Sequence, residues 1–296
     1  MYNIYLERGD FMASFVIHDI AGEQFLNTIQ NRLGISLSQA EINKFLMGNL
    51  IPDSSRVNFT IPENLSKEEL KALKWQRSQA IQEEKTATHF RSPEEYDLTI
   101  QAPKLDKFIE KYNSLFSKDI SVLGYFFHLY TDVLFFGDLF EKTFTCLDEF
   151  GNPTIYNSKT KSMELKKDKK RYPVTDIFSH DSEVSIYQDY TKMNASVLNQ
   201  FQTVFDYEGL LASANTFINP GIEEVDYENI VSVLGKTAAF IKESYELQET
   251  TLKVFDEFIV SKFIPEVVES FIATYGELIS KSLPVKSVPI LKKETN

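Results

Sequence analysis

The stretch from Leu123 to Asp138, LGYFFHLYTDVLFFGD, limits most strongly what this chain can fold into. Its run of apolar and aromatic residues predicts a helix inside a core, and the run also contains His128 and Asp132. Because they are four residues apart, these two side chains lie on one face of a helix. Burying two ionisable groups is costly unless they pair or bind something, and a metal ion would supply a partner. The stretch therefore predicts a core helix that carries part of a metal site.

Helical spacing of apolar residues recurs along much of the chain. The segment 14–33 has this spacing and is followed by a glycine that is typical of a helix end. Ser38 with Glu41, and Ser66 with Glu69, form capping-box patterns that predict the starts of two further helices. No strand pattern is sustained. We therefore predict a mainly α fold, a multi-helix bundle.

The segment 148–175 differs in character from the rest of the chain. It contains the turn-like sequences FGNP and YNSKT, which predict an irregular insertion at the surface with room for a short hairpin. We interpret its basic residues as a solvated loop in preference to a phosphate-binding patch. These residues are Lys159, Lys161, Lys166, Lys167, Lys169, Lys170 and Arg171.

Length and patterning predict one α-helical metal-binding domain over residues 1–282. Helical spacing continues through 227–279, where Pro265 predicts a kink or a break. The last residues, 283–296, contain two prolines and a charged end, and predict a loosely attached tail.

The overall charge limits the partners of the chain. Its 296 residues include 31 basic and 43 acidic side chains, which give a net charge of -12. This balance argues against broad electrostatic binding to nucleic acids or anionic membranes, although a local basic patch is compatible with it. The oligomeric state is not indicated.

The single cysteine, Cys146, excludes an intrachain disulfide and a thiolate metal cluster, so a metal site would have to use histidines and carboxylates. Glu7, Arg8 and Asp10 interrupt the beginning of the chain where a signal peptide needs an apolar core. We also interpret the apolar runs as too short to cross a membrane, which takes a run of roughly 18 residues. These features predict a soluble, cytoplasmic protein without a transmembrane segment.

Three further residues are candidate ligands in sequence order. His18 lies near the start of the first predicted helix, Asp53 follows a proline just after the second, and His89 lies in the sequence THFR. Each has a simpler interpretation alone: a half-buried helix residue, a turn residue or a helix cap. The chain has only four histidines, which makes their association with carboxylates more informative.

Taken in order, these residues resemble the zinc-dependent phospholipase C superfamily, which also contains single-strand-specific nucleases. The matching pieces span about residues 12–140. They are FVIHDIAGEQFL with His18, FLMGNLIPDSSR with Asp53, THFR with His89, and LGYFFHLYTD with His128 and Asp132.

The resemblance implies an all-α bundle that encloses zinc ions. Asp53, His89, His128 and Asp132 would form one metal site, and His18 would bind a neighbouring ion that Asp132 bridges. Histidine and carboxylate ligands also suit manganese or iron, so we expect one or two divalent transition-metal ions.

The implied activity is hydrolysis of phosphoesters. Two close metal ions can activate a water and stabilise the charge of a phosphoryl transition state, and a nearby carboxylate can take the proton. We expect Asp53 to act as this base as well as a ligand. The acidic balance of the chain favours a small phosphoester or a lipid head group as substrate over a nucleic acid.

The sequence departs from the family pattern in two places. The secreted enzymes use a free N-terminal tryptophan as a ligand, whereas this chain begins Met1-Tyr2. They also have further ligands after the H-x-x-x-D helix, where this chain offers only Asp138, Glu141 and Asp148. Asp189, in the later predicted helix SIYQDYTKMN, is therefore our candidate for a sixth ligand.

Two alternatives remain open. His180 and Asp181 form an adjacent His-Asp pair, which is the motif of HD-type phosphohydrolases. The chain could also be a non-catalytic helical binding protein that retains a structural metal site, because part of the expected ligand set is missing.

Overall fold

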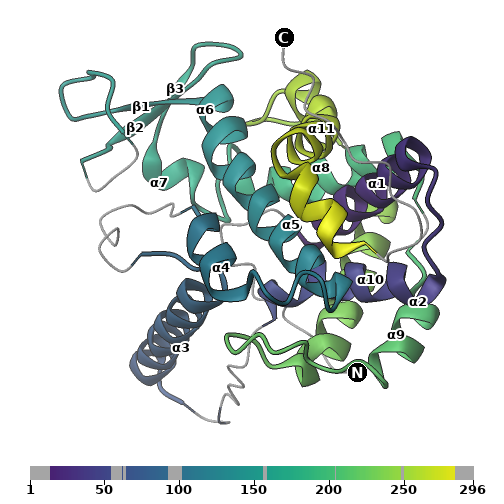
Figure 1. Cartoon of the computed structure of the whole chain (residues 1–296). Helices are drawn as coiled ribbons and strands as arrows, with labels where there is room; N and C mark the ends of the chain where they lie inside the picture. Colours follow the sequence, from purple (N-terminus) through teal and green to yellow (C-terminus); the bar gives the residue numbers. More distant parts are fainter. Residues whose placement is uncertain are drawn as a thin grey trace.

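The helices predicted from apolar spacing are present in the computed structural model, which describes residues 14–54, 62, 65–92, 102–155, 159–203, 205–247 and 250–283. The mainly α prediction is confirmed, since the only sheet in this part of the chain has three short strands (Figure 1). The first half contains α1 (Phe15–Leu33), α2 (Gln39–Leu50), η1 (Ile51–Asp53), α3 (Lys67–Thr88), α4 (Leu105–Tyr112), α5 (Ile120–Leu134), η3 (Phe135–Leu139) and α6 (Phe140–Thr143).

Local capping explains where the early helices begin. The Ser38 hydroxyl accepts a hydrogen bond from the Glu41 backbone N–H at 3.3 Å, and the Glu41 carboxylate accepts one from the Ser38 N–H at 2.7 Å. Ser66 and Glu69 repeat this arrangement at the start of α3. Both predicted capping boxes are therefore confirmed. Gly34 ends α1 with a φ of 61°, a left-handed conformation that glycine adopts without steric cost.

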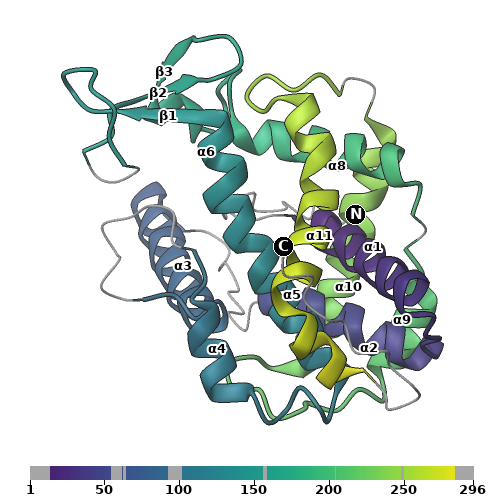
Figure 2. The ribbon, with the colours of Figure 1, turned by 45° about the horizontal axis from the view of Figure 1, so that its top comes forward.

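Helix α5 is the central element of the helical body. It packs against α1, α2, α4, α11 and η1, and both ribbon views place it in the middle (Figures 1 and 2). Its residues from Ile120 to Asp132 are all buried. The apolar side chains of the described helices form one continuous core around it.

Two glycines let α2 and α5 come into backbone contact. A Cβ atom added to Gly48 would lie 2.1 Å from the Ser121 carbonyl oxygen. A Cβ atom on Gly124 would lie 2.1 Å from the Phe45 carbonyl oxygen. Because only hydrogen fits at these positions, the glycines set the close distance between the two helices.

The helical run through α5, η3 and α6 corrects one expectation. Over Ile120–Thr143 it has 24 residues and is long and apolar enough to cross a membrane. However, 83% of its most apolar window is buried within the protein, which is the pattern of a core helix in a soluble protein. Element η3 is a π-helical turn inside this run.

The region predicted as an irregular insertion contains an antiparallel sheet. Strands β1 (Phe144–Leu147), β2 (Ser162–Leu165) and β3 (Arg171–Pro173) lie in that order, with Cys146 opposite Met163. The sheet starts directly after α6, before the predicted boundary at residue 148, and is followed by α7 (Val174–Ile177). The hairpin expectation was therefore sound, but the insertion is more ordered than predicted. It projects from the helical body (Figures 1 and 2).

The second half continues the helical body. It contains α8 (Ile186–Phe201), α9 (Tyr207–Ala214), η4 (Tyr227–Asn229), α10 (Ile230–Glu246) and α11 (Glu257–Ser282). Of the predicted kink or break at Pro265, the break is wrong, because α11 continues through this residue and its non-helical residue is Tyr275, with φ -116° and ψ 25°. The Ser261 carbonyl, which a proline at 265 cannot satisfy, accepts a hydrogen bond from the Gln200 side chain at 2.9 Å. The predicted tail lies, except for Leu283, outside the described residues.

Candidate metal centre

Five predicted ligands converge at the centre of the helical body. His18 comes from α1, Asp53 from η1, His89 from the end of α3, and His128 and Asp132 from α5. Four of these side chains are 0% exposed, namely His18, His89, His128 and Asp132. Asp53 is 8% exposed. The close contact of α2 with α5 brings η1, which follows α2 directly, beside the α5 ligands.

The His128 ring is held in one tautomer. Its Nδ1 lies 2.8 Å from the Asn49 carbonyl oxygen, at the end of α2. A carbonyl oxygen can only accept a hydrogen bond, so Nδ1 must carry the proton. The Nε2 lone pair of neutral His128 is therefore free to act as a ligand. The Asn49 side chain also donates to the His18 carbonyl at 2.5 Å and so joins α1 to α2.

The His89 ring is oriented in a similar way. Its Nδ1 lies 3.1 Å from the Lys85 carbonyl oxygen and 2.8 Å from the Thr88 hydroxyl. The carbonyl favours a proton on Nδ1, which directs the Nε2 lone pair toward the centre. Tyr125 supports this helix end by donating to the Thr88 carbonyl at 2.6 Å.

In these tautomers, the unprotonated Nε2 atoms of His89 and His128 lie close to each other and to the Asp132 carboxylate, and all of these atoms are hydrogen-bond acceptors. The Nε2 atoms of His89 and His128 are 3.2 Å apart, and the Asp132 Oδ2 atom is 3.4 Å from the first and 3.8 Å from the second. Asp53 Oδ1 lies 3.5 Å from His89 Nε2. Lone pairs at such distances repel unless a cation lies between them. Ligands about 2.1 Å from a tetrahedral ion are about 3.4 Å from one another, which matches these separations.

His18 and the second oxygen of Asp132 form an adjoining group. His18 Nε2 is 3.4 Å from Asp132 Oδ1, and the His18 ring stacks on the His128 ring with centroids 3.7 Å apart. Both ring nitrogens of His18 and both oxygens of Asp132 are buried without a hydrogen-bond partner. Buried polar groups are rarely left in this state, so the donor set fits a metal ion. Asp132 therefore has Oδ1 toward His18, and Oδ2 toward His89 and His128.

The protonation states also suit metal binding. Burial, followed by the electrostatic effect of the neighbouring imidazole of His18, lowers the pKa of His128 to about 3. Burial lowers the pKa of His89 as well, against the opposing effect of Asp53. Burial acts to raise the pKa of Asp132, but the His18 side chain and the other two imidazoles outweigh it and lower the pKa. Near neutral pH, His89 and His128 are therefore uncharged beside the Asp132 carboxylate, as metal ligands must be.

The geometry identifies two overlapping groups that could hold a metal ion, His18–His128–Asp132 and Asp53–His89–His128. No family model, curated protein or solved structure matches this chain. The case for bound metal thus depends on the buried histidines and aspartates themselves.

The structure gives Asp189 a different role from the predicted one. Its carboxylate accepts hydrogen bonds from the backbone N–H groups of Lys253, Val254 and Phe255 at 2.9, 2.6 and 3.0 Å. It belongs to neither of the two groups that could hold a metal ion. We therefore correct the sixth-ligand prediction: Asp189 joins α8 to the segment that precedes α11.

Replacing Asp189 tests this assignment. Asp189→Asn is expected to lower the free energy of unfolding by about 2 kcal/mol, because an amide cannot accept all three buried backbone hydrogen bonds as a carboxylate does. The metal content should stay at the wild-type level. Urea denaturation and elemental analysis measure the two quantities, and loss of metal with unchanged stability would restore the ligand role.

The His-Asp pair of the HD-type alternative lies outside the centre. His180 and Asp181 are exposed, and the His180 ring stacks on Tyr187 with centroids 3.9 Å apart. Neither residue belongs to a group that could hold a metal ion. The alternative required this pair among the ligands, so the geometry does not support it.

The acidic residues after the α5 ligands also lie outside both groups. Asp138 pairs with Lys142 at 2.7 Å, and Glu141 is exposed. The Asp148 carboxylate accepts hydrogen bonds from the backbone N–H groups of Phe150 and Asn152. The second ligand group of the family pattern therefore has no counterpart among these three residues.

Sequence reasoning missed the residues that orient the imidazoles. Asn49 lies in the GNLIPD sequence and Thr88 directly precedes His89, so their positions beside predicted ligands were a usable signal. Their roles depend on a backbone carbonyl and on a neighbouring hydroxyl, which residue types do not reveal. Lys85 contributes its backbone carbonyl, one helical turn before His89.

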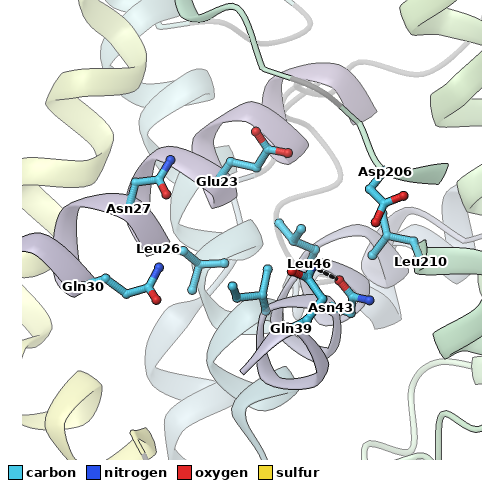
Figure 3. A pocket seen from close by; sticks show the side chains of 10 residues that line it. Glu23, Leu26, Asn27, Gln30, Gln39, Asn43, Leu46, Asp206 and Leu210 are labelled. Carbon is cyan, nitrogen blue, oxygen red and sulfur yellow. Dashed lines mark hydrogen bonds between the residues drawn. The ribbon is translucent and has the colours of Figure 1, made fainter. Parts of the chain in front are cut away.

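A separate pocket of about 190 Å³ lies between α1, α2 and α9 (Figure 3). Its lining includes none of the five candidate ligands. Several of its polar groups are engaged in structural hydrogen bonds. Gln30 accepts one from the Leu37 N–H, Asn43 donates one to Ser213, and Asp206 caps α9 by accepting one from Gly209. We assign this pocket no part in the metal centre.

Proposed function

We propose that the protein is a metal-dependent hydrolase of phosphoesters, with zinc as the preferred ion at one or two positions. The supporting observation is that His18, Asp53, His89, His128 and Asp132 converge in three dimensions. They also follow the order of the zinc-dependent phospholipase C superfamily. We further propose a cytoplasmic location and, as substrate, a small phosphoester or a lipid head group.

The protein residues have distinct tasks in this proposal. His89, His128, Asp132 and Asp53 would hold one ion, and His18 with the second Asp132 oxygen would hold its neighbour. The carbonyls of Lys85 and Asn49 keep the two imidazole Nε2 lone pairs directed inward. When bound, the ions would supply Lewis-acid activation of water and charge stabilisation at phosphorus.

Asp53 is the residue to which we assign proton transfer. It is the most exposed of the five side chains, so it lies nearest to solvent. Burial acts to raise its pKa, but His128, His89 and the positive charge of Lys85 together hold the pKa below its ordinary value. Asp53 is therefore a carboxylate at neutral pH and can accept a proton from water.

A substrate panel tests the activity. Nitrophenyl phosphate monoesters and diesters should be hydrolysed by the zinc-loaded protein, and Asp53→Asn should lower kcat by about 100-fold or more. The control Asp138→Asn changes an exposed carboxylate that lies outside both groups, and should leave kcat unchanged. Absence of hydrolysis by a fully metal-loaded protein on every ester would contradict the proposal.

The structure also favours one alternative, a helical binding protein with a structural ion. Four of the five side chains are 0% exposed, and structural metal sites are typically closed, whereas catalytic sites keep a position open to substrate. Under this alternative, the protein binds metal stoichiometrically, and removal of the metal lowers stability without any activity to lose. The same panel therefore separates the two functions.

A further inference from the structure

The sheet that projects from the helical body exposes two large apolar side chains. We name residues 144–155 and 159–173 the sheet extension. Phe150 is 80% exposed and Ile155 is 70% exposed, and both lie in the segment between β1 and β2. Exposed apolar residues are ordinary when they are scattered, but here two of them are five residues apart on a projecting element (Figures 1 and 2).

The sheet extension also gathers the basic residues of the sequence. Seven basic and four acidic residues lie between positions 148 and 175, in a chain whose net charge is -12. Lys166 donates to the Glu141 carbonyl, and Lys167 donates to the carbonyls of Leu252 and Phe255. These acceptors are uncharged, so they do not neutralise the two lysines, while the charge of Lys167 also acts on the carboxylates of Asp168 and Asp189.

The acidic residues of the sheet extension compensate only part of this charge. Glu164 pairs with Arg171 at 2.9 Å and lies 4.0 Å from Lys169 Nζ, and Asp168 pairs with Lys170 at 3.3 Å. Asp148 is occupied by the backbone of the turn that presents Phe150. The extension therefore retains positive charge, whereas the rest of the chain is acidic.

The apolar turn and the basic strand lie next to each other. A Cβ atom on Gly151 would be 3.7 Å from an Arg171 guanidinium nitrogen, so the residue after Phe150 lies beside the start of β3. Arg171 faces Glu164 of β2 across the sheet. The turn that joins β2 to β3 carries the exposed Lys169 and Lys170. Apolar and cationic groups thus share one projecting unit.

We propose that the sheet extension is a docking element for the surface of a membrane that contains anionic phospholipids. Phe150 and Ile155 would enter the boundary between head groups and acyl chains, and the surrounding lysines would contact lipid phosphates and carboxylates. The acidic remainder of the chain would be repelled by the same surface, so the molecule approaches with the extension first. This role goes beyond the proposed hydrolase, because neither docking residue belongs to the metal centre.

Vesicle flotation tests the docking surface. The full-length protein should float with vesicles of equal parts phosphatidylcholine and phosphatidylserine, and should not float with phosphatidylcholine alone. The double variant Phe150→Ser/Ile155→Ser should bind the anionic vesicles about tenfold more weakly or worse, because it loses the inserted apolar area. The matched control Ile218→Ser/Val231→Ser removes two exposed apolar residues outside the extension and should bind like the wild type.

Charge and insertion can be read out separately. Lys161→Gln/Lys169→Gln should weaken binding by about tenfold, whereas the control Lys118→Gln/Lys242→Gln should not. Phe150→Trp should preserve binding, and its fluorescence relative to the wild type should shift to shorter wavelength when anionic vesicles are added. Circular dichroism melts of each variant confirm that these exposed changes leave the fold intact.

Three results would overturn the docking proposal. The wild-type protein could fail to float with anionic vesicles, or the Phe150→Ser/Ile155→Ser variant could bind as tightly as its control. Alternatively, a single-stranded oligonucleotide could bind in a manner that depends on the extension while vesicles do not, which would assign this surface to nucleic acid. Because metal content is not part of the readout, failure here is distinguishable from failure of the hydrolase proposal.

Discussion

Replacing Asp132 by asparagine is expected to remove the bound metal and to cause a large loss of stability. Asp132 lies between candidate ligands on both sides, because its Oδ1 is 3.4 Å from His18 Nε2 and its Oδ2 is 3.4 Å from His89 Nε2. An ion that binds only the folded state, at a thousand times its Kd, adds about 4 kcal/mol to the free energy of unfolding. The variant should lose this contribution and show metal at the background level.

The experiment combines elemental analysis with thermal unfolding of protein prepared without a metal-affinity tag. Chelation of the wild type should lower its Tm to nearly that of Asp132→Asn, and the variant should respond little to the chelator. The two losses are not additive because both remove the same ion. His180→Ala is the control, since that exposed histidine lies outside both groups. A wild type without stoichiometric metal, even after reconstitution, would contradict the metal centre.

Gly124→Ala is expected to damage both the fold and the centre. Its new Cβ would lie 2.1 Å from the Phe45 carbonyl oxygen and 3.0 Å from the Asn49 N–H nitrogen. These are backbone atoms of a packed helix and cannot rotate away as the end of a side chain can. Helices α2 and α5 must therefore separate, at a cost of about 3 kcal/mol or more in the free energy of unfolding.

Separation of α2 from α5 should also change the positions of the candidate metal ligands. It would lengthen the 2.8 Å hydrogen bond between His128 Nδ1 and the Asn49 carbonyl, so the metal content should fall together with stability. Gly235→Ala is the matched control: it lies inside α10 and has no atom within 4 Å of the added Cβ. That change should stabilise the protein by about 0.5–1 kcal/mol. Urea denaturation of both variants measures the difference, and equal stabilities would contradict the close-contact interpretation.

Much of the helical framework was predictable because its signals are local. The capping boxes at Ser38 and Ser66 and the glycine at 34 each act within one helical turn, so their residue types are sufficient evidence. Pro265 shows where this reasoning fails. Its missing hydrogen bond is replaced at the Ser261 carbonyl by Gln200, a residue from another helix.

The candidate site also has a part that local sequence patterns predict and a part that only the fold determines. His128 and Asp132 are both on α5, so helical spacing was enough to place them on one face. His18, Asp53 and His89 were selected by residue type, order and family resemblance, and the fold brings them to the same point. Asp189, outside the family resemblance, was the candidate for a sixth ligand. Its partners are backbone N–H groups more than sixty residues away, which no local pattern reveals.

Residue spacing alone therefore indicates the helices and the one helical face that carries His128 and Asp132, because those relations are set by the geometry of a single helix. Only the tertiary packing decides which carboxylates become ligand candidates and which hold the backbone. It also decides the tautomers of the imidazoles, since these depend on the carbonyls of Asn49 and Lys85. The physical reason is that a buried polar group takes its role from the partners that packing brings within hydrogen-bonding distance.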